Sequence, residues 1–152
     1  MTEPSTPAAS ASPFAWTADH TAVRVPDFEA AVAWYSEKLD FRMKQTWVLG
    51  AVTYAYLHPE NDDRFSIELL AGPGAEPRPA FADLHESYGF AGWHHVCLRV
   101  VSVADTTEEL RRRGVKIVSE PHDVAVAGLT VAFFCDPWGN LFELAQPMAS
   151  AG

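Results

Sequence analysis

The second half of this 152-residue chain repeats residues of the first half at a fixed offset of 75 positions. His20 and His95 are related by this offset, and so are Glu68 and Glu143. The same spacing links three further pairs: Arg24 and Arg99, Val25 and Val100, and Leu69 and Leu144. Neither half is long enough to bury both faces of a sheet by itself. The repeat therefore predicts one domain built from two similar modules that pack together.

The first half has the pattern of a strand, a helix and three further strands. Alternating and β-branched side chains predict strands over 15–25, 41–49, 52–58 and 64–70. Pro26 and Asp27 follow the first strand, and Asp27 has the side chain of a helix N-cap. Apolar residues at helical spacing from Phe28 to Leu39 predict an amphipathic helix. This half is therefore expected to be a βαβββ module over 15–72.

The second half repeats this order after a linker over 73–92 that is rich in Pro and Ala and is expected to hold a short helix near 79–88. Strands are expected over 93–101, 115–119, 122–135 and 141–145, with a break near Gly128. Ser102 begins a helix that ends near Gly114, and DPWGN from Asp136 predicts a tight turn. The second module then covers 93–147, residues 1–14 form a disordered tail, and 148–152 form a second tail.

Charge and composition narrow the kinds of partner. The chain has 11 Lys and Arg against 20 Asp and Glu, a net charge of −9, whereas binding to phosphates needs clustered cations. A small-molecule substrate is therefore expected, and nucleic acid and membrane are not. Cys97 and Cys135 are too few for a disulfide framework, and no Lys or Arg precedes Arg24 to begin a signal peptide. We expect a cytoplasmic protein.

Strand alternation places the repeated His and Glu side chains on equivalent faces. In the expected strands, each of these residues lies opposite the apolar face that would pack on a helix: His20, Glu68, His95 and Glu143. Two such sheets side by side would aim two imidazoles and two carboxylates into one cavity. This mixed set suits a divalent cation with positions left for water or substrate. His94 competes with His95, but its strand phase places it on the opposite face, as a structural or pocket-edge residue.

Four segments of the chain resemble the vicinal oxygen chelate superfamily, which includes glyoxalase I, methylmalonyl-CoA epimerase, extradiol dioxygenases, and fosfomycin and bleomycin resistance proteins. The segments are HTAVRVPDFEAAVAWY from His20, IEL from Ile67, HVCLRV from His95 and FFCDPWGNLFEL from Phe133. GWHHVCL from Gly92 is similar to the epimerase, and DPWGN from Asp136 is similar to glyoxalases and dioxygenases. The resemblance covers about residues 15–147.

The resemblance implies an α+β fold, in which two βαβββ modules form a U-shaped mixed sheet around a metal, with helices on the outer face. It implies one divalent cation (Ni, Zn, Co, Mn or Fe) held by His20, Glu68, His95 and Glu143. A homodimer is also implied, and whether modules pair within a chain or across the dimer stays open. Extradiol dioxygenases and fosfomycin-resistance enzymes share three of these positions, whereas a Glu at 68 is what glyoxalase I has.

Four further residues are candidates for contact with substrate: Arg24, Cys97, Trp138 and Tyr56. Arg24 matches a glutathione-contacting arginine of glyoxalase I, although Gly72 stands where that enzyme has an asparagine. Of the two repeated arginines, Arg24 rather than Arg99 is expected to contact substrate. The run 111–113 of arginines is expected to be the last turn of a helix, where the dipole favours cations.

The leading interpretation is a metal-dependent isomerase, epimerase or lyase that moves a proton next to a carbonyl group. Its substrate would chelate the cation through two neighbouring oxygens, and Glu143, or else Glu68, would act as the base. The epimerase uses an additional carboxylate on its early strands, whereas residues 41–59 contain no Asp or Glu. The alternatives are an extradiol-type Fe(II) dioxygenase and a binding protein that sequesters a drug or metabolite without catalysis.

Overall fold

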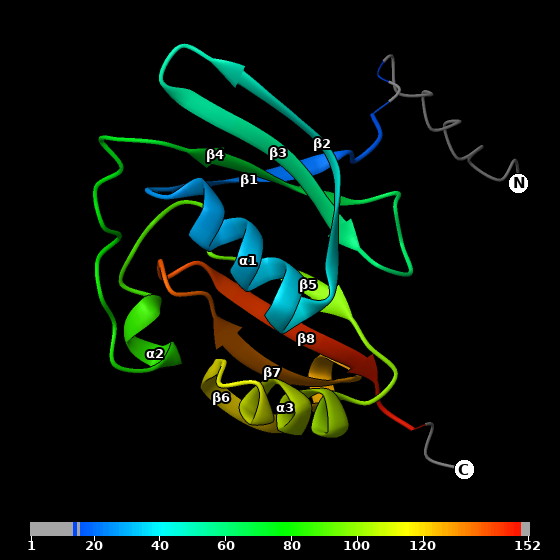
Figure 1. Ribbon diagram of the computed structural model, residues 1–152. Helices are drawn as coiled ribbons and strands as arrows, with labels where there is room; N and C mark the ends of the chain where they lie inside the picture. Colours follow the sequence, from blue (N-terminus) through cyan, green and yellow to red (C-terminus); the bar gives the residue numbers. More distant parts are fainter. Residues whose placement is uncertain (1–13, 15, 150–152) are drawn as a thin grey trace, which may run out of the picture.

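A computed structural model describes residue 14 and residues 16–149 (Figure 1). The expected disordered tail at 1–14 lies almost wholly outside the described residues, as does most of the expected tail at 148–152. Among the described residues, no helix is long and apolar enough to cross a membrane.

The first module forms a four-stranded mixed sheet with one helix. Its elements are β1 (His20–Val25), α1 (Phe28–Leu39), β2 (Phe41–Leu49), β3 (Val52–Pro59) and β4 (Ser66–Ala71). The strand order is β1-β4-β3-β2, with β1 parallel to β4 and the other neighbours antiparallel. The crossover through α1 is what allows β1 and β4 to run parallel. The predicted βαβββ order is therefore confirmed for this half.

The second module repeats this topology. Its elements are β5 (His95–Arg99), α3 (Val103–Arg112), β6 (Lys116–Val124), the 3₁₀ turn η1 (Ala125–Ala127), β7 (Leu129–Cys135) and β8 (Leu141–Pro147), and α2 (Leu84–Ser87) lies in the linker. The order β5-β8-β7-β6, with β5 parallel to β8, matches the first sheet strand for strand. The two-module α+β fold expected from the repeat is confirmed.

Several boundaries differ from the prediction: β1 begins at His20 rather than at 15, β5 covers only His95–Arg99, and the linker helix α2 covers only Leu84–Ser87. The second module differs at a further point. The sequence places a break between a strand at 115–119 and another at 122–135, but β6 continues through that point and ends at Val124. Its pairing with β7 shifts register between Ser119 and His122, so the alternation slips within one continuous strand. The predicted break near Gly128 is confirmed: β6 and β7 are separated by η1 and Gly128, whose φ of 64° is in the left-handed region that glycine favours.

Side-chain caps begin both long helices as the sequence predicts. The Asp27 carboxylate accepts a hydrogen bond from the backbone N–H of Ala30 at 2.7 Å. The Ser102 hydroxyl accepts from the N–H of Asp105 at 3.1 Å. These bonds satisfy donors that have no partner within the helix. The caps fix where each crossover begins and thus where β1 and β5 must end.

The two modules share one hydrophobic core. Apolar residues from the helix-facing sides of both sheets belong to it, among them Val25, Ile67 and Leu69 of the first sheet and Phe134, Phe142 and Leu144 of the second. Tyr35 of α1 joins them, because its ring stacks on Trp138 at 6.4 Å and meets the edge of Phe142 at 6.2 Å. Figure 1 shows α1 between the two sheets. The opposite faces of both sheets are consequently turned away from the core.

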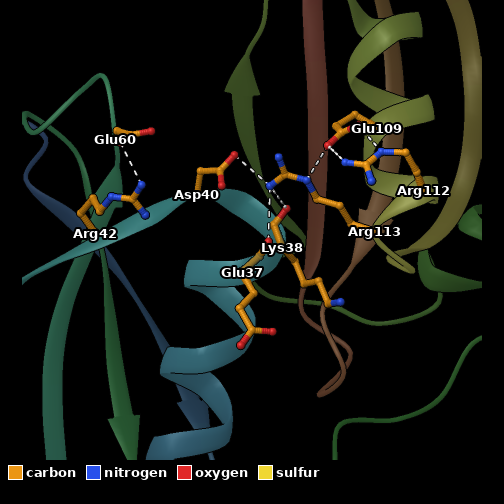
Figure 2. Close-up of polar contacts among 8 residues, drawn as sticks. All are labelled: Glu37, Lys38, Asp40, Arg42, Glu60, Glu109, Arg112 and Arg113. Atoms are coloured by element: carbon orange, nitrogen blue, oxygen red, sulfur yellow. Dashed lines mark hydrogen bonds and ion pairs between the residues drawn. The ribbon is translucent and has the colours of Figure 1, made fainter.

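Arg113, at the end of α3, ties the modules together at the end of α1 (Figure 2). Its guanidinium donates to the Asp40 carboxylate at 2.8 Å and to the backbone carbonyl of Lys38 at 3.3 Å. It also donates to Glu109 of its own module at 2.7 Å. Arg112 in contrast bonds Glu109 alone. The arginine run is a helix terminus, as the sequence predicts, and its last member also bridges the two modules.

We expect the Arg113→Ala substitution to lower the free energy of unfolding by about 1 kcal/mol, since several partly exposed hydrogen bonds across the module junction are lost. Arg112→Ala is the matched control and should change stability little, because Arg112 is exposed and its partner Glu109 lies on the same helix. Urea titration followed by circular dichroism measures both. Equal effects of the two substitutions would contradict a bridging role for Arg113.

Candidate metal centre

The first His–Glu pair lies across β1 and β4. His20 and Glu68 are on adjacent parallel strands, and the His20 Nε2 atom is 3.5 Å from the Glu68 Oε2 atom. On the other side of the ring, Nδ1 lies 2.6 Å from a carboxylate oxygen of Asp19. A carboxylate at Nδ1 fixes the ring orientation and leaves Nε2 free to act as a ligand. Asp19 therefore positions His20.

The second pair repeats this arrangement across β5 and β8. The His95 Nε2 atom is 3.2 Å from the Glu143 Oε2 atom. The edge of the His95 ring meets the face of Phe133, with ring centroids 5.4 Å apart. The Nδ1 atom of His95 lies 2.8 Å from Nδ1 of His94, so one ring donates and the other accepts. The ring of His95 is thus held by the imidazole of His94, whereas the ring of His20 is held by the carboxylate of Asp19.

His94 lies outside the strand, so strand phase assigns it no face, and its contacts fit the predicted structural or pocket-edge role. β5 begins at His95, so His94 precedes the strand and is not subject to its alternation. Its ring stacks on Tyr88, and its Nε2 atom is 2.9 Å from the Ser87 hydroxyl of α2. Desolvation, followed by the nearby His95 and Arg78, lowers the pKa of His94. A neutral His94 is therefore favoured as the partner of His95.

Cys97 lies directly across from Glu143 on the neighbouring strand. Desolvation, together with a hydrogen bond and the negative charge from Glu143, raises the pKa of the Cys97 thiol to about 12. The thiol therefore stays protonated near neutral pH and donates to the Glu143 carboxylate.

Aromatic side chains flank the first pair. The Tyr56 ring lies 5.1 Å from the His20 ring, and Tyr56 is paired in register with Glu68. Trp47 of β2 stacks on Tyr54 at 5.2 Å and 9° and contacts Tyr56 at 5.1 Å. These rings form an apolar wall beside His20, and Tyr56 is its member in contact with the His20 ring.

The described chain does not bring the two pairs together. Among residues 14 and 16–149, no three His, Cys, Asp or Glu side chains lie close enough to hold one metal ion. Both pairs lie on the sheet faces that are turned away from the shared core, with His20 and His95 exposed. β1 and β5, which carry the histidines, are also edge strands of their sheets. Each module therefore carries one His–Glu pair of its own.

Arg24 and Trp138 lie apart from both pairs. They line a cavity of about 590 Å³ at the seam between the modules, beneath the linker segment 75–81, and none of the four His and Glu residues lines it. The Trp138 ring packs on Tyr35 and Trp34. The Arg24 guanidinium donates at 2.7–2.9 Å to four backbone carbonyls, those of Val25, Leu70, Gly72 and Pro73. In this structure Arg24 holds the chain that follows β4.

Comparison with known proteins identifies the family. The family model of the Glyoxalase/Bleomycin resistance protein/Dioxygenase superfamily matches residues 17–144. The chain belongs to this superfamily. A probable lactoylglutathione lyase of Synechocystis sp. is 28% identical over 130 residues, which cover 84% of this chain and 92% of that protein. The mitochondrial methylmalonyl-CoA epimerase of Bos taurus is 29% identical over 133 residues, covering 84% and 73%.

The crystal structure of glyoxalase I from Zea mays matches with a TM-score of 0.66 and 27% identity. The match covers 86% of this chain and 44% of the maize chain, so this chain spans less than half of that protein. The crystal structure of UcmS2 matches with a TM-score of 0.66 and 27% identity over 87% of this chain and 98% of that one. Glyoxalase-superfamily folds therefore occur in chains of about this length and in longer ones.

Sequence reasoning missed Asp19 and the contact between His94 and His95. Asp19 directly precedes β1, and His94 directly precedes β5, so both lie at the position before the histidine in the repeat. Alternation assigns such neighbours to opposite faces only inside a strand. The available signal was the shared position of two polar side chains, Asp19 and His94, 75 residues apart.

Proposed function

We propose that this member of the glyoxalase superfamily is a metal-dependent lyase or isomerase that moves a proton next to a carbonyl group of a small substrate. The observation that carries the proposal is the pair of matching His–Glu contacts, 3.5 Å and 3.2 Å long, on outward faces of the two modules. Superfamily members generally use a divalent metal. Two imidazole nitrogens and two carboxylates fit a cation such as Zn²⁺, Ni²⁺, Co²⁺, Mn²⁺ or Fe²⁺.

The complete ligand set requires two copies of the chain. His20 and Glu68 of one copy would face His95 and Glu143 of the second, so a symmetric homodimer has two equivalent sites. Placing edge strand β1 beside edge strand β5 of the other copy would also cover strand edges that are otherwise open. Such a junction would give the U-shaped sheet, with the helices on its outer side.

The cation, when bound, supplies Lewis acidity to two neighbouring oxygens of the substrate and so acidifies the adjacent C–H group. His20 and His95 hold fixed positions, because Asp19 and His94 orient their rings. Glu143 is the preferred base, since the protonated Cys97 thiol donates to it and keeps its carboxylate in place. Released from the cation, Glu143 would take the proton from the carbon next to the carbonyl group and return it to the product. Glu68 is the alternative base.

The relatives of this chain include proteins named lactoylglutathione lyase and methylmalonyl-CoA epimerase. Their names favour a proton-transfer reaction over cleavage of an aromatic ring. Glu68 favours it too, because a two-His, one-carboxylate iron site needs no fourth protein ligand. Incubation in D₂O with lactoylglutathione or methylmalonyl-CoA should place deuterium beside the carbonyl without uptake of O₂. Uptake of O₂ with a catechol would instead support the dioxygenase alternative.

Metal content gives a direct test of the proposed site. Purified wild-type protein should hold about one divalent cation per chain, and His95→Ala should lower the metal affinity by more than about 100-fold, since even partners of ligands contribute 10- to 100-fold. His122→Ala is the matched control, because His122 is exposed and bonds only the carbonyl of Glu120. Plasma mass spectrometry measures the content. Wild-type protein without metal would contradict both enzyme interpretations.

A further inference from the structure

The 75-residue repeat gives each module one arginine at the same place relative to its histidine, and the structure uses the two arginines differently. Arg24 and Arg99 each follow their histidine by four residues and share its face of the strand. All the hydrogen bonds that Arg24 makes go to backbone carbonyls, two of them beyond the end of β4. Arg24 has therefore little donor capacity left for a ligand.

Arg99 keeps its donor capacity. Apart from its electrostatic effect on the Cys97 thiol, its side chain has no hydrogen bond or ion pair with any residue that the structure describes. The two arginines differ because the chain takes different paths after β4 and after β8. After β4 the chain passes Gly72, whose φ is 153°, and returns its carbonyls to Arg24. After β8 the chain runs on beside η1, where the N–H of Met148 donates to the carbonyl of Gly128, so it does not reach Arg99.

The surface between Glu143 and Arg99 carries no competing charge. Arg99 is paired in register with Ala145, and Cys97 is paired with Glu143. The next strand places Val131 beside Ala145 and Phe133 beside Glu143. Val131, Phe133 and Ala145 are all buried apolar side chains. An apolar floor weakens solvent screening and so strengthens a charge-assisted hydrogen bond made above it.

Most other cations already have partners. Arg42, Arg64 and the arginines at 111–113 form ion pairs, and Lys44 and Arg78 donate to carbonyl oxygens. Lys38 lies on α1, and Lys116 lies on β6 at the far edge of the sheet from β5. Arg99 is thus the unpaired cation that shares a strand with a proposed metal ligand.

We propose that Arg99 binds an anionic group at the far end of the substrate, which is therefore a small molecule with a metal-chelating oxygen pair, an apolar middle and a carboxylate or similar anion. The inference rests on the proposed function, because it takes His95 and Glu143 as ligands. Four residues of strand separate His95 from Arg99 by about 13 Å along the backbone, which gives the approximate length of the apolar middle. The sequence favours Arg24 for contact with substrate, and we assign this contact to Arg99.

Binding of chelating probes to the cobalt-loaded protein tests this assignment. The probes are monohydroxamic acids of straight-chain dicarboxylic acids of increasing length, each compared with its uncharged methyl ester. A hydroxamate supplies two neighbouring oxygens, so the acid and the ester differ only in the distant charge. At one chain length the acid should bind wild-type protein about ten-fold or more tightly than the ester, as measured by calorimetry and the cobalt visible spectrum.

Arg99→Gln should make the two affinities equal, and Arg99→Lys should restore part of the preference for the acid. Arg24→Gln is the matched control from the repeat and should keep the preference, and Arg112→Gln serves the same purpose if Arg24→Gln folds poorly. An unchanged preference in Arg99→Gln would overturn this inference alone, as would probes that do not bind the metal-loaded protein. Failure of the wild-type protein to bind metal would overturn the proposed function, and this inference with it.

Discussion

Two inactive variants should restore activity to each other when their chains are combined. The double variant His20→Ala, Glu68→Gln lacks the first pair of ligands, and His95→Ala, Glu143→Gln lacks the second. Each alone should lose metal binding and activity by more than about 100-fold. If each site takes one pair from each copy, a mixed dimer contains one intact and one empty site. Random exchange then restores about a quarter of the wild-type sites.

The physical basis of this expectation is the position of the pairs in the fold. Both lie on faces turned away from the core that the modules share, and no three candidate ligands meet within the described residues. Bringing them together inside one chain would require that core to open. Differently tagged chains that copurify show that mixed dimers have formed. Mixed dimers without recovered metal would place the four ligands in one chain and contradict the two-copy site.

Removal of the Asp136 carboxylate should have the largest effect on stability. Asp136 is 3% exposed and accepts hydrogen bonds from the Tyr35 hydroxyl at 2.8 Å and the Asn140 side chain at 2.7 Å. It also accepts from the backbone N–H groups of Trp138 and Asn140. Asp136→Ala leaves these donors without a partner, so we expect a loss of about 3–5 kcal/mol in the free energy of unfolding.

The pKa shifts of Asp136 and Tyr35 bear on which of the two groups carries the proton of their hydrogen bond. Burial raises the pKa of Asp136 above its usual value, and the hydrogen bonds from Asn140, Tyr35 and Trp138 offset part of that rise by stabilising the carboxylate. Burial raises the pKa of Tyr35 well above its usual value, so the phenol keeps the proton that it donates. This bond links α1 of the first module to the β7–β8 turn of the second.

Denaturant titration of wild type and Asp136→Ala measures the predicted loss. Asp123→Ala is the matched control, because Asp123 is exposed and accepts one hydrogen bond, from Thr130. It should change stability little. A loss in Asp136→Ala as small as in Asp123→Ala would show that the turn does not depend on its buried carboxylate.

Most of the fold can be predicted from local sequence patterns, because strand alternation and helix caps each depend on only a few neighbouring residues. Period-two alternation predicts which side of each strand is apolar, and the Asp27 and Ser102 side chains mark both helix starts. One misplaced strand boundary lies at the register shift between Ser119 and His122. A bulge is set by pairing with β7, which no local pattern contains.

The sequence by itself determined the two-module architecture and the four candidate ligands, because a duplication repeats both the strand order and the strand phase. The tertiary structure decided which ligands meet: it pairs His20 with Glu68 and His95 with Glu143, and it leaves the two pairs on outward faces. It also distinguished two arginines that are equivalent in the repeat. Whether an arginine is free depends on where distant carbonyls lie, and only the path of the chain after β4 brings those carbonyls to Arg24.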